Sequence, residues 1–284
     1  GFHLSVSWQA AFQKRQIDVN GDLFKLNGGN ADKYFEGTAK APVIPSFQAA
    51  YVINDKWSVS AQFAIGGGGG KCEFDSGLPM FEELVGGKLA PQIAGGVAPY
   101  AMSQNLVGEQ YFYGFQVGGT YRIADNFSVF AGVRGVLANC GYEGSISNIS
   151  IDGKNAAFYA NAMQQAAAGA QQAAAAGNAV LAAELQAKAT AAGTAAFLMG
   201  DYGLDCSQSG FGITPIIGLD WNLGKLNLAA KYEFRTKIEL ENESTNSANV
   251  DALMPAYADG GKVRSDIPAL LTLGAQYQLT DAVR

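Results

Sequence analysis

The chain contains few charged residues, one histidine and no long apolar run. Charged residues make up 15% of its 284 residues, and the net charge of −6 disfavours nucleic acid as a partner. No run of about 18 strongly apolar residues is present, so the sequence predicts no transmembrane helix. Aromatic residues reach 11%. A composition with little charge and many aromatic residues is unlike that of a disordered chain.

The residues that usually carry chemistry match no catalytic or metal-binding motif. The histidine, His3, lies in a predicted strand, and GxSxG, HExxH and phosphate-binding glycine motifs are absent. The three cysteines, Cys72, Cys140 and Cys206, have neither metal-ligand nor redox spacing. We therefore expect no catalytic site, no metal and no cofactor.

Apolar and polar residues instead alternate along the chain, most clearly over Lys225–Leu240. Its even-numbered positions are apolar or aromatic apart from one threonine, and its odd-numbered positions carry all the charges. Successive side chains of a strand point to opposite faces, so this pattern predicts a two-faced strand. Its length of about 16 residues exceeds the usual 5–6. Such a strand is typical of a wall between lipid and a polar interior.

Seven further stretches repeat this alternation, which gives eight predicted strands. The seven are Phe2–Phe12, Phe47–Ile53, Trp57–Ile65, Tyr111–Ile123, Phe127–Leu137, Ile213–Leu223 and Leu271–Leu279. Connections rich in Asn, Asp or Gly predict tight hairpin turns. These turns are Asn54–Lys56, Ala124–Asn126 and Leu223–Lys225, with a fourth beginning at Asp281. The hairpins are separated by four predicted loops, Gln13–Pro45, Gly66–Tyr100, Gly141–Gly210 and Glu241–Pro268.

Short turns at one end of the strands and long loops at the other are typical of an outer-membrane β-barrel. Aromatic residues near the predicted strand ends match the girdles of such barrels. They are Trp57, Tyr111, Tyr121, Phe127, Trp221 and Tyr277. Long loops and long strands disfavour the alternative, a soluble β-sandwich. We predict an all-β fold, a single transmembrane antiparallel barrel domain over residues 1–284, in the outer membrane of a Gram-negative cell.

One predicted loop contains an alanine-rich insertion, Ala156–Phe197. Alanine is the best helix former, so the insertion should be helical. Gly177–Asn178 should divide it into a helical hairpin, and Glu184 with Lys188 forms a favourable i,i+4 pair. The insertion is too weakly apolar to span a bilayer. The sequence leaves two interpretations open, a cap over the barrel mouth and a solvated spacer.

Five consecutive glycines follow the predicted strand Trp57–Ile65. They are Gly66, Gly67, Gly68, Gly69 and Gly70. Glycine weakens strand pairing and packs no side chain, so one interpretation is a kink or lateral opening in the wall. The other interpretation is the flexible start of a loop.

Cys140 and Cys206 flank the helical insertion at the ends of two neighbouring predicted strands. Antiparallel pairing would bring these ends together, and an oxidising compartment would favour a disulfide between them. The sequence does not separate the three pairings of the three cysteines, and free thiols are the alternative.

Charged residues on the polar strand faces are the candidate ligand contacts. One interpretation is that they line a polar passage or hold a carboxylate ligand. The other is that they pair with one another and stiffen the barrel interior. The basic candidates are Arg122, Arg134, Lys231, Arg235 and Lys237, of which Arg134 and Arg235 are favoured, and the acidic residues beside them are Asp220, Glu233 and Glu239.

Several stretches resemble one known family. Lys262–Pro268 (KVRSDIP) with Ala269–Asp281 resembles the late-strand signature of the long-chain fatty-acid transporter family of outer-membrane proteins (FadL-like, OmpP1/TodX). Gly210–Asn242 is similar to the preceding hairpin in members from the Bacteroides group, some of which are labelled hemin receptors. Ala41–Gly70 is similar to the second and third strands. The resemblance runs along most of the chain and rests on strand-and-turn patterns.

The resemblance implies a barrel of roughly fourteen strands with an N-terminal hatch. In this family, hydrophobic ligands bind near the outer loops and leave sideways at a kinked third strand, which here is Trp57–Ile65. The chain supplies about eight strands and begins without an initiator methionine or signal peptide. We therefore expect it to be a piece of a longer protein.

From the resemblance we expect passive uptake of long-chain fatty acids or other hydrophobic small molecules. A general diffusion porin and a surface barrel that binds haem or another ligand are the alternatives, and a barrel enzyme is least favoured. The expected partners are fatty acids, detergents and outer-membrane lipid. A monomer is expected.

Overall fold

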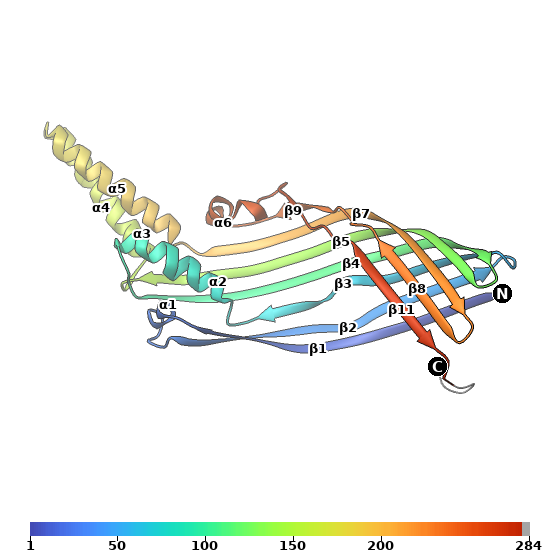
Figure 1. The fold of residues 1–284 in the computed structure, drawn as a ribbon. Helices are drawn as coiled ribbons and strands as arrows, with labels where there is room; N and C mark the ends of the chain where they lie inside the picture. The colour runs from blue at the N-terminus through green and yellow to red at the C-terminus, as the bar shows by residue number, and fades with distance from the viewer. Residues whose placement is uncertain (280–284) are drawn as a thin grey trace.

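The computed structural model describes residues 1–279, and its main feature is an antiparallel sheet curled into a half-barrel (Figure 1). Eight strands follow one another across the sheet in the order β1, β2, β3, β4, β5, β7, β8 and β11. Their bounds are Phe2–Asn20, Asp32–Val52, Trp57–Phe74, Tyr100–Ala124, Phe127–Ile151, Tyr202–Leu223, Leu226–Glu233 and Leu270–Tyr277. The predicted all-β architecture is confirmed, and the described residues form an open half-barrel with β1 and β11 at its edges.

The two faces of the half-barrel differ in polarity, as the alternation predicts. The inner face carries a polar row in register across six strands, formed by Ser5, Gln48, Gln62, Gln116, Arg134 and Thr214. The outer face carries apolar residues, and on it Phe63 opposes Phe115 while Trp57 opposes Tyr121. Phe115 is 52% exposed, so the apolar side chains of this face have no protein cover.

Three predicted tight turns are confirmed, and they join β2 to β3, β4 to β5 and β7 to β8. Gly224 in the last of these turns has a φ of 77°, a left-handed conformation that glycine adopts without strain. The turn expected at Asp281 lies outside the described residues.

The long connections are shorter than predicted because the strands continue past the apolar pattern. The β1–β2 connection spans residues 21–31 rather than Gln13–Pro45, and the β3–β4 connection spans 75–99 rather than Gly66–Tyr100. Likewise, β5 continues to Ile151 and β7 starts at Tyr202. The added strand ends mix polar and apolar residues less regularly, so the period-two contrast weakens there. Backbone hydrogen bonds do not depend on that contrast and continue the sheet.

The strand predicted over Lys225–Leu240 is divided after Glu233. β8 ends at that residue, and β9 (Glu239–Ser244) resumes the pairing with β7. Pro215 of β7 contributes to the division, because its carbonyl accepts from the Phe234 N–H at 3.0 Å while the proline has no N–H to donate in return.

The division shifts the register by one residue and exchanges the two faces of the strand. Ile216 opposes Glu233 in β8, whereas Ser209 opposes Glu241 in β9. A one-residue slip turns every later side chain to the other face. Ile238 and other even-numbered residues therefore pack on the inner face of β5. The prediction that Lys237 and Glu239 point into the lumen is wrong for this reason.

The alanine-rich insertion forms the predicted helical hairpin, α4 (Ala156–Ala175) and α5 (Ala179–Leu198). Asn155 and Asn178 cap the two helices by accepting backbone N–H groups, and Glu184 pairs with Lys188 at 2.9 Å. The hairpin projects beyond the end of the sheet (Figure 1). Within residues 1–279 no helix has the length and apolar character needed to cross a membrane.

The remaining elements are short. They are α1 (Asp22–Lys25), α2 (Pro79–Glu82), the π-helix η1 (Glu83–Leu89), α3 (Ala90–Ala94), β6 (Lys154–Asn155), α6 (Ala248–Leu253), the 3₁₀-helix η2 (Pro255–Tyr257) and β10 (Lys262–Arg264). Among them, α1, α2, η1, α3 and α6 contribute residues to a small core at the same end as the hairpin. Val85, Ile149, Met199 and Val250 are almost fully buried there. The base of the helical hairpin packs into this core through Leu198.

A buried carboxylate, Glu82, joins the β1–β2 and β3–β4 connections to the starts of β2 and β4. Its side chain is 2% exposed, and it lies 3.0 Å from the Lys33 ammonium. It also accepts hydrogen bonds from Asn27 (3.0 Å), Tyr100 (2.6 Å) and Gln104 (3.2 Å). Burial, reinforced by this carboxylate, raises the pKa of the Tyr100 hydroxyl. The network fixes the loops against the start of β4.

Candidate functional site

The wall of the half-barrel is interrupted between β2 and β3. Residue pairs run as far as Lys40 with Lys71 at the helical end and resume at Ser46 with Ala64. Five residues of β2 face six of β3 in between, without ladder pairing. Pro42 lies in the unpaired segment of β2 and lacks the N–H that a ladder requires.

The five glycines form the opposite side of this break. Gly68 has a φ of 69°, and a Cβ added there would lie 1.9 Å from the Gln110 carbonyl oxygen. A Cβ at Gly70 would lie 2.6 Å from the Lys40 carbonyl oxygen. Two register shifts in the β3–β4 pairing also fall within Ile65–Gly70. The glycines therefore lie inside β3 at two bulges, rather than at the start of a loop.

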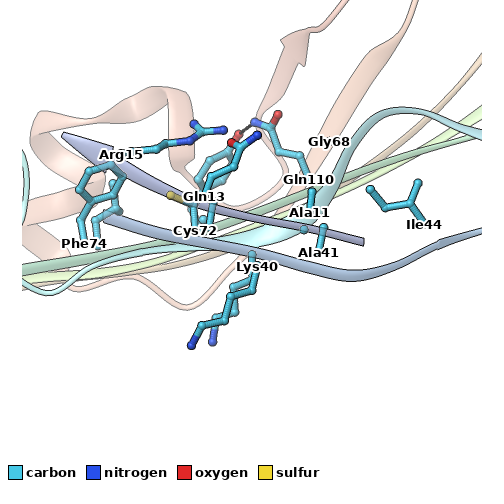
Figure 2. Close-up of a pocket in the computed structure, with 16 residues that line it drawn as sticks. Ala11, Gln13, Arg15, Lys40, Ala41, Ile44, Gly68, Cys72, Phe74 and Gln110 are labelled. Carbon is cyan, nitrogen blue, oxygen red and sulfur yellow. Dashed lines mark hydrogen bonds between the residues drawn. The ribbon is translucent and has the colours of Figure 1, made fainter. Parts of the chain in front are cut away.

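A pocket of about 380 Å³ lies against the break, a size within the range of small-molecule sites. Its lining is mostly apolar, with several polar groups from β1, β4 and β5. The lining includes Gln13, Arg15, Ala39, Ile44, Leu106 and Gln110. Figure 2 shows Arg15, Gln13 and Gln110 on one side of the strands and Lys40 extending to the other side.

Arg15 supplies the guanidinium of this pocket, whose lining also includes Lys40 and Lys71. Among residues 1–279 it forms neither an ion pair nor a side-chain hydrogen bond within the distance criteria. The Gln110 amide nearby donates to the Tyr142 hydroxyl at 2.6 Å. An unengaged guanidinium beside apolar residues is suited to an anionic group that carries an apolar tail.

Two lysines lie on the outer side of the same break. Lys40 and Lys71 are directly opposite each other across β2 and β3, and Lys71 is 3.0 Å from Glu73. The next position of the row on β1 is Phe12, which is 69% exposed. The lysines therefore mark the level at which the outer face changes from apolar to charged.

The favoured basic residues of the sequence prediction lie away from this pocket, in ion pairs. Arg134 is 2.7 Å from Glu233 and donates to Gln116 at 3.0 Å, and Lys231 is 2.7 Å from the same carboxylate. Arg235, by contrast, lies beyond the division of the strand, is 57% exposed and pairs with Asp266. The shared carboxylate of Glu233 favours, for Arg134 and Lys231, the interpretation of a paired lattice that stiffens the interior.

The other charged candidates are dispersed. Arg122 lies near the turn end of β4 and, like Lys237, forms no ion pair within the described residues. Asp220 accepts a hydrogen bond from Asn227 at 2.8 Å, and Glu239 pairs with Lys262 at 3.2 Å. The structure brings none of these residues to the break.

The structure does not join Cys140 and Cys206. Both thiols are free and buried. Cys140 opposes Gln208 and Cys206 opposes Tyr142, so the two cysteines are diagonal neighbours. Diagonal neighbours lie roughly 7–8 Å apart, whereas a disulfide needs Cβ atoms about 3.5–4.5 Å apart.

Sequence reasoning missed most of the residues that line the break. Gln13 and Arg15 lay in a predicted loop, because their strand continues where both faces are polar. Pro42 and Pro45 were a usable signal, since two prolines three residues apart cannot belong to a fully paired strand. No protein-family model and no curated protein matches this chain.

Proposed function

We propose that this chain forms the wall of an outer-membrane β-barrel that takes up fatty acids or other hydrophobic small molecules. The molecules enter the pocket beside Arg15 and leave sideways through the break between β2 and β3. The observation that carries this proposal is the interrupted pairing at Ala41–Pro45 with a pocket directly against it.

The height of the outer apolar band supports a membrane location. On β4 the outward positions from Tyr121 to Tyr111 are apolar, aromatic or glycine, and the next outward residue is Glu109. Ten steps of about 3.3 Å give about 33 Å along the strand. A strand tilt of about 40° reduces this to about 25 Å, the height of the apolar band in outer-membrane barrels.

The open edges of the half-barrel support closure by further strands. In a membrane every backbone polar group needs a partner, so an open sheet edge is not tolerated in lipid. We propose that about six additional strands close the barrel to roughly fourteen, as the family resemblance implies.

Passage of polar solutes is the second candidate function. The inner row contains Gln48, Gln62, Gln116 and Arg134, of which only Arg134 is charged. This row lies at the level of the outer apolar band. A polar inner wall at that level is also found in water-filled porins.

Uptake of labelled oleate by cells that display the protein in the outer membrane tests the proposal. We expect uptake that depends on the protein and that falls when Pro42→Val and Pro45→Val restore two backbone N–H groups beside the break. Pro215→Val, which restores an N–H on β7, is the matched control and should leave uptake unchanged. A surface-folded protein that admits small sugars into liposomes but no oleate into cells would support the porin instead.

A further inference from the structure

Two pairs of aromatic rings lie on the outer face, with small residues between them. On β3 and β4, the tilted rings of Trp57 and Tyr121 have a centroid distance of 4.7 Å, and those of Phe63 and Phe115 a distance of 4.8 Å. Trp57 and Phe63, the members of the two pairs on β3, are six residues apart, or about 20 Å. The outer surface between Trp57 and Phe63 therefore has an aromatic pair at each end.

The surface between the two aromatic pairs contains an open groove of about 570 Å³. Its lining includes the small residues Ala49, Ala61 and Ala131 and the larger residues Tyr51, Val117 and Val133. Ala49 is directly opposite Ala61, and Ala61 is opposite Val117. Short side chains in adjacent strands thus lower the surface between taller neighbours, and no charged side chain lines the groove.

We infer that this outer groove binds one acyl chain of a membrane lipid, an inference that rests on the membrane location in the proposed function. The groove lies within the apolar band, so its occupant is apolar along its whole length. An acyl chain in this open groove contacts the small residues and the larger side chains beside them, whereas a flat wall offers it fewer contacts. Dispersion contacts are individually small but add up over a chain, so lipid stays longer here than elsewhere on the barrel.

Quenching of tryptophan fluorescence by a brominated phosphatidylcholine tests the inference, because Trp57 belongs to the aromatic pair at one end of the groove. The protein contains three tryptophans. Trp8→Phe with Trp221→Phe leaves Trp57, and Trp8→Phe with Trp57→Phe leaves Trp221 as a reference outside the groove. The full chain is placed in phosphatidylcholine vesicles that contain an increasing fraction of the brominated lipid.

We expect half-maximal quenching of Trp57 at a brominated fraction about fourfold lower than for Trp221, a preference that a few additional carbon contacts supply. Ala61→Phe fills the groove and should remove this difference. Ala275→Phe adds the same ring on β11, outside the groove, and should preserve it.

Three results would overturn the inference, and they separate its failure from that of the membrane location. Equal quenching of Trp57 and Trp221, unchanged by Ala61→Phe, would show that the groove exchanges lipid like the rest of the wall. Protection of Trp57 alone, together with a cross-linked dimer that Ala61→Phe abolishes, would assign the groove to a second copy. Absence of quenching at both tryptophans would refute the membrane location itself.

Discussion

The Arg134 guanidinium and the Glu233 carboxylate are 2.7 Å apart on the inner face, although their strands, β5 and β8, are separated by β7. Glu233 is the last residue of β8, and the register shift begins immediately after it. The pair therefore fixes the end of a short strand to the middle of a long one.

Breaking this pair should destabilise the half-barrel by more than an exposed ion pair would. The Glu233 side chain is 10% exposed and that of Arg134 is 26% exposed. We expect Arg134→Met and Glu233→Gln to show a coupling free energy of about 1 kcal/mol in a double-mutant cycle of denaturant unfolding in micelles. The exposed pair Lys14–Glu36 is the control, with an expected coupling of about 0.5 kcal/mol or less. Equal couplings would contradict the inner-lattice interpretation.

Substitution at Gly68 should be far more costly than substitution at Gly66. Gly68 has a positive φ, and an added Cβ would meet the Gln110 carbonyl oxygen at 1.9 Å, whereas at Gly66 the nearest atom is 3.8 Å away. Backbone strain of this kind costs about 1–3 kcal/mol. Gly68→Ala should therefore lower the free energy of unfolding by at least that amount, and Gly66→Ala by less than about 1 kcal/mol. Similar losses at both sites would show that β3 is not bulged at Gly68.

Removal of the Glu82 carboxylate should loosen the loops at the helical end. Glu82→Gln leaves the Lys33 ammonium without its ion-pair partner, and hydrogen bonds to charged groups contribute about 1.5–3 kcal/mol. We expect faster amide hydrogen exchange at the start of β4 and over α1, with the strands beyond unaffected. Glu83→Gln, at the exposed neighbouring position, is the control and should leave exchange unchanged.

Alkaline pH should weaken the same end of the molecule through Tyr202. Burial raises the pKa of its hydroxyl to about 12, and the hydroxyl donates to the Leu198 carbonyl oxygen at 2.7 Å. A pKa raised in the folded state means that the unfolded state loses its proton first, at about pH 10. The free energy of unfolding should therefore fall between about pH 10 and 12. Tyr202→Phe should reduce the slope of that fall, and an identical slope would contradict the assignment.

The fold was predictable where side-chain chemistry repeats, and the candidate site was not. Alternation located all eight principal strands, and alanine content located the helical hairpin. The strand ends around Arg15 were missed because both faces are polar there. The division at Pro215 and the break at Pro42 depend on which strand lies opposite, and a single sequence does not specify its partners.

The helical hairpin offers a decisive test between the two interpretations that the sequence left open. The hairpin contacts the loop core only near its base, through residues such as Leu198, and it projects beyond the sheet. Replacement of residues 161–194 by a short glycine–serine linker should remove most of the helical circular dichroism. It should leave the melting temperature of the sheet and the uptake of oleate unchanged, because the deleted part covers neither the break nor the pocket. Loss of uptake from a correctly assembled barrel would identify the hairpin as a ligand-gathering cap, whereas retained uptake identifies it as a spacer.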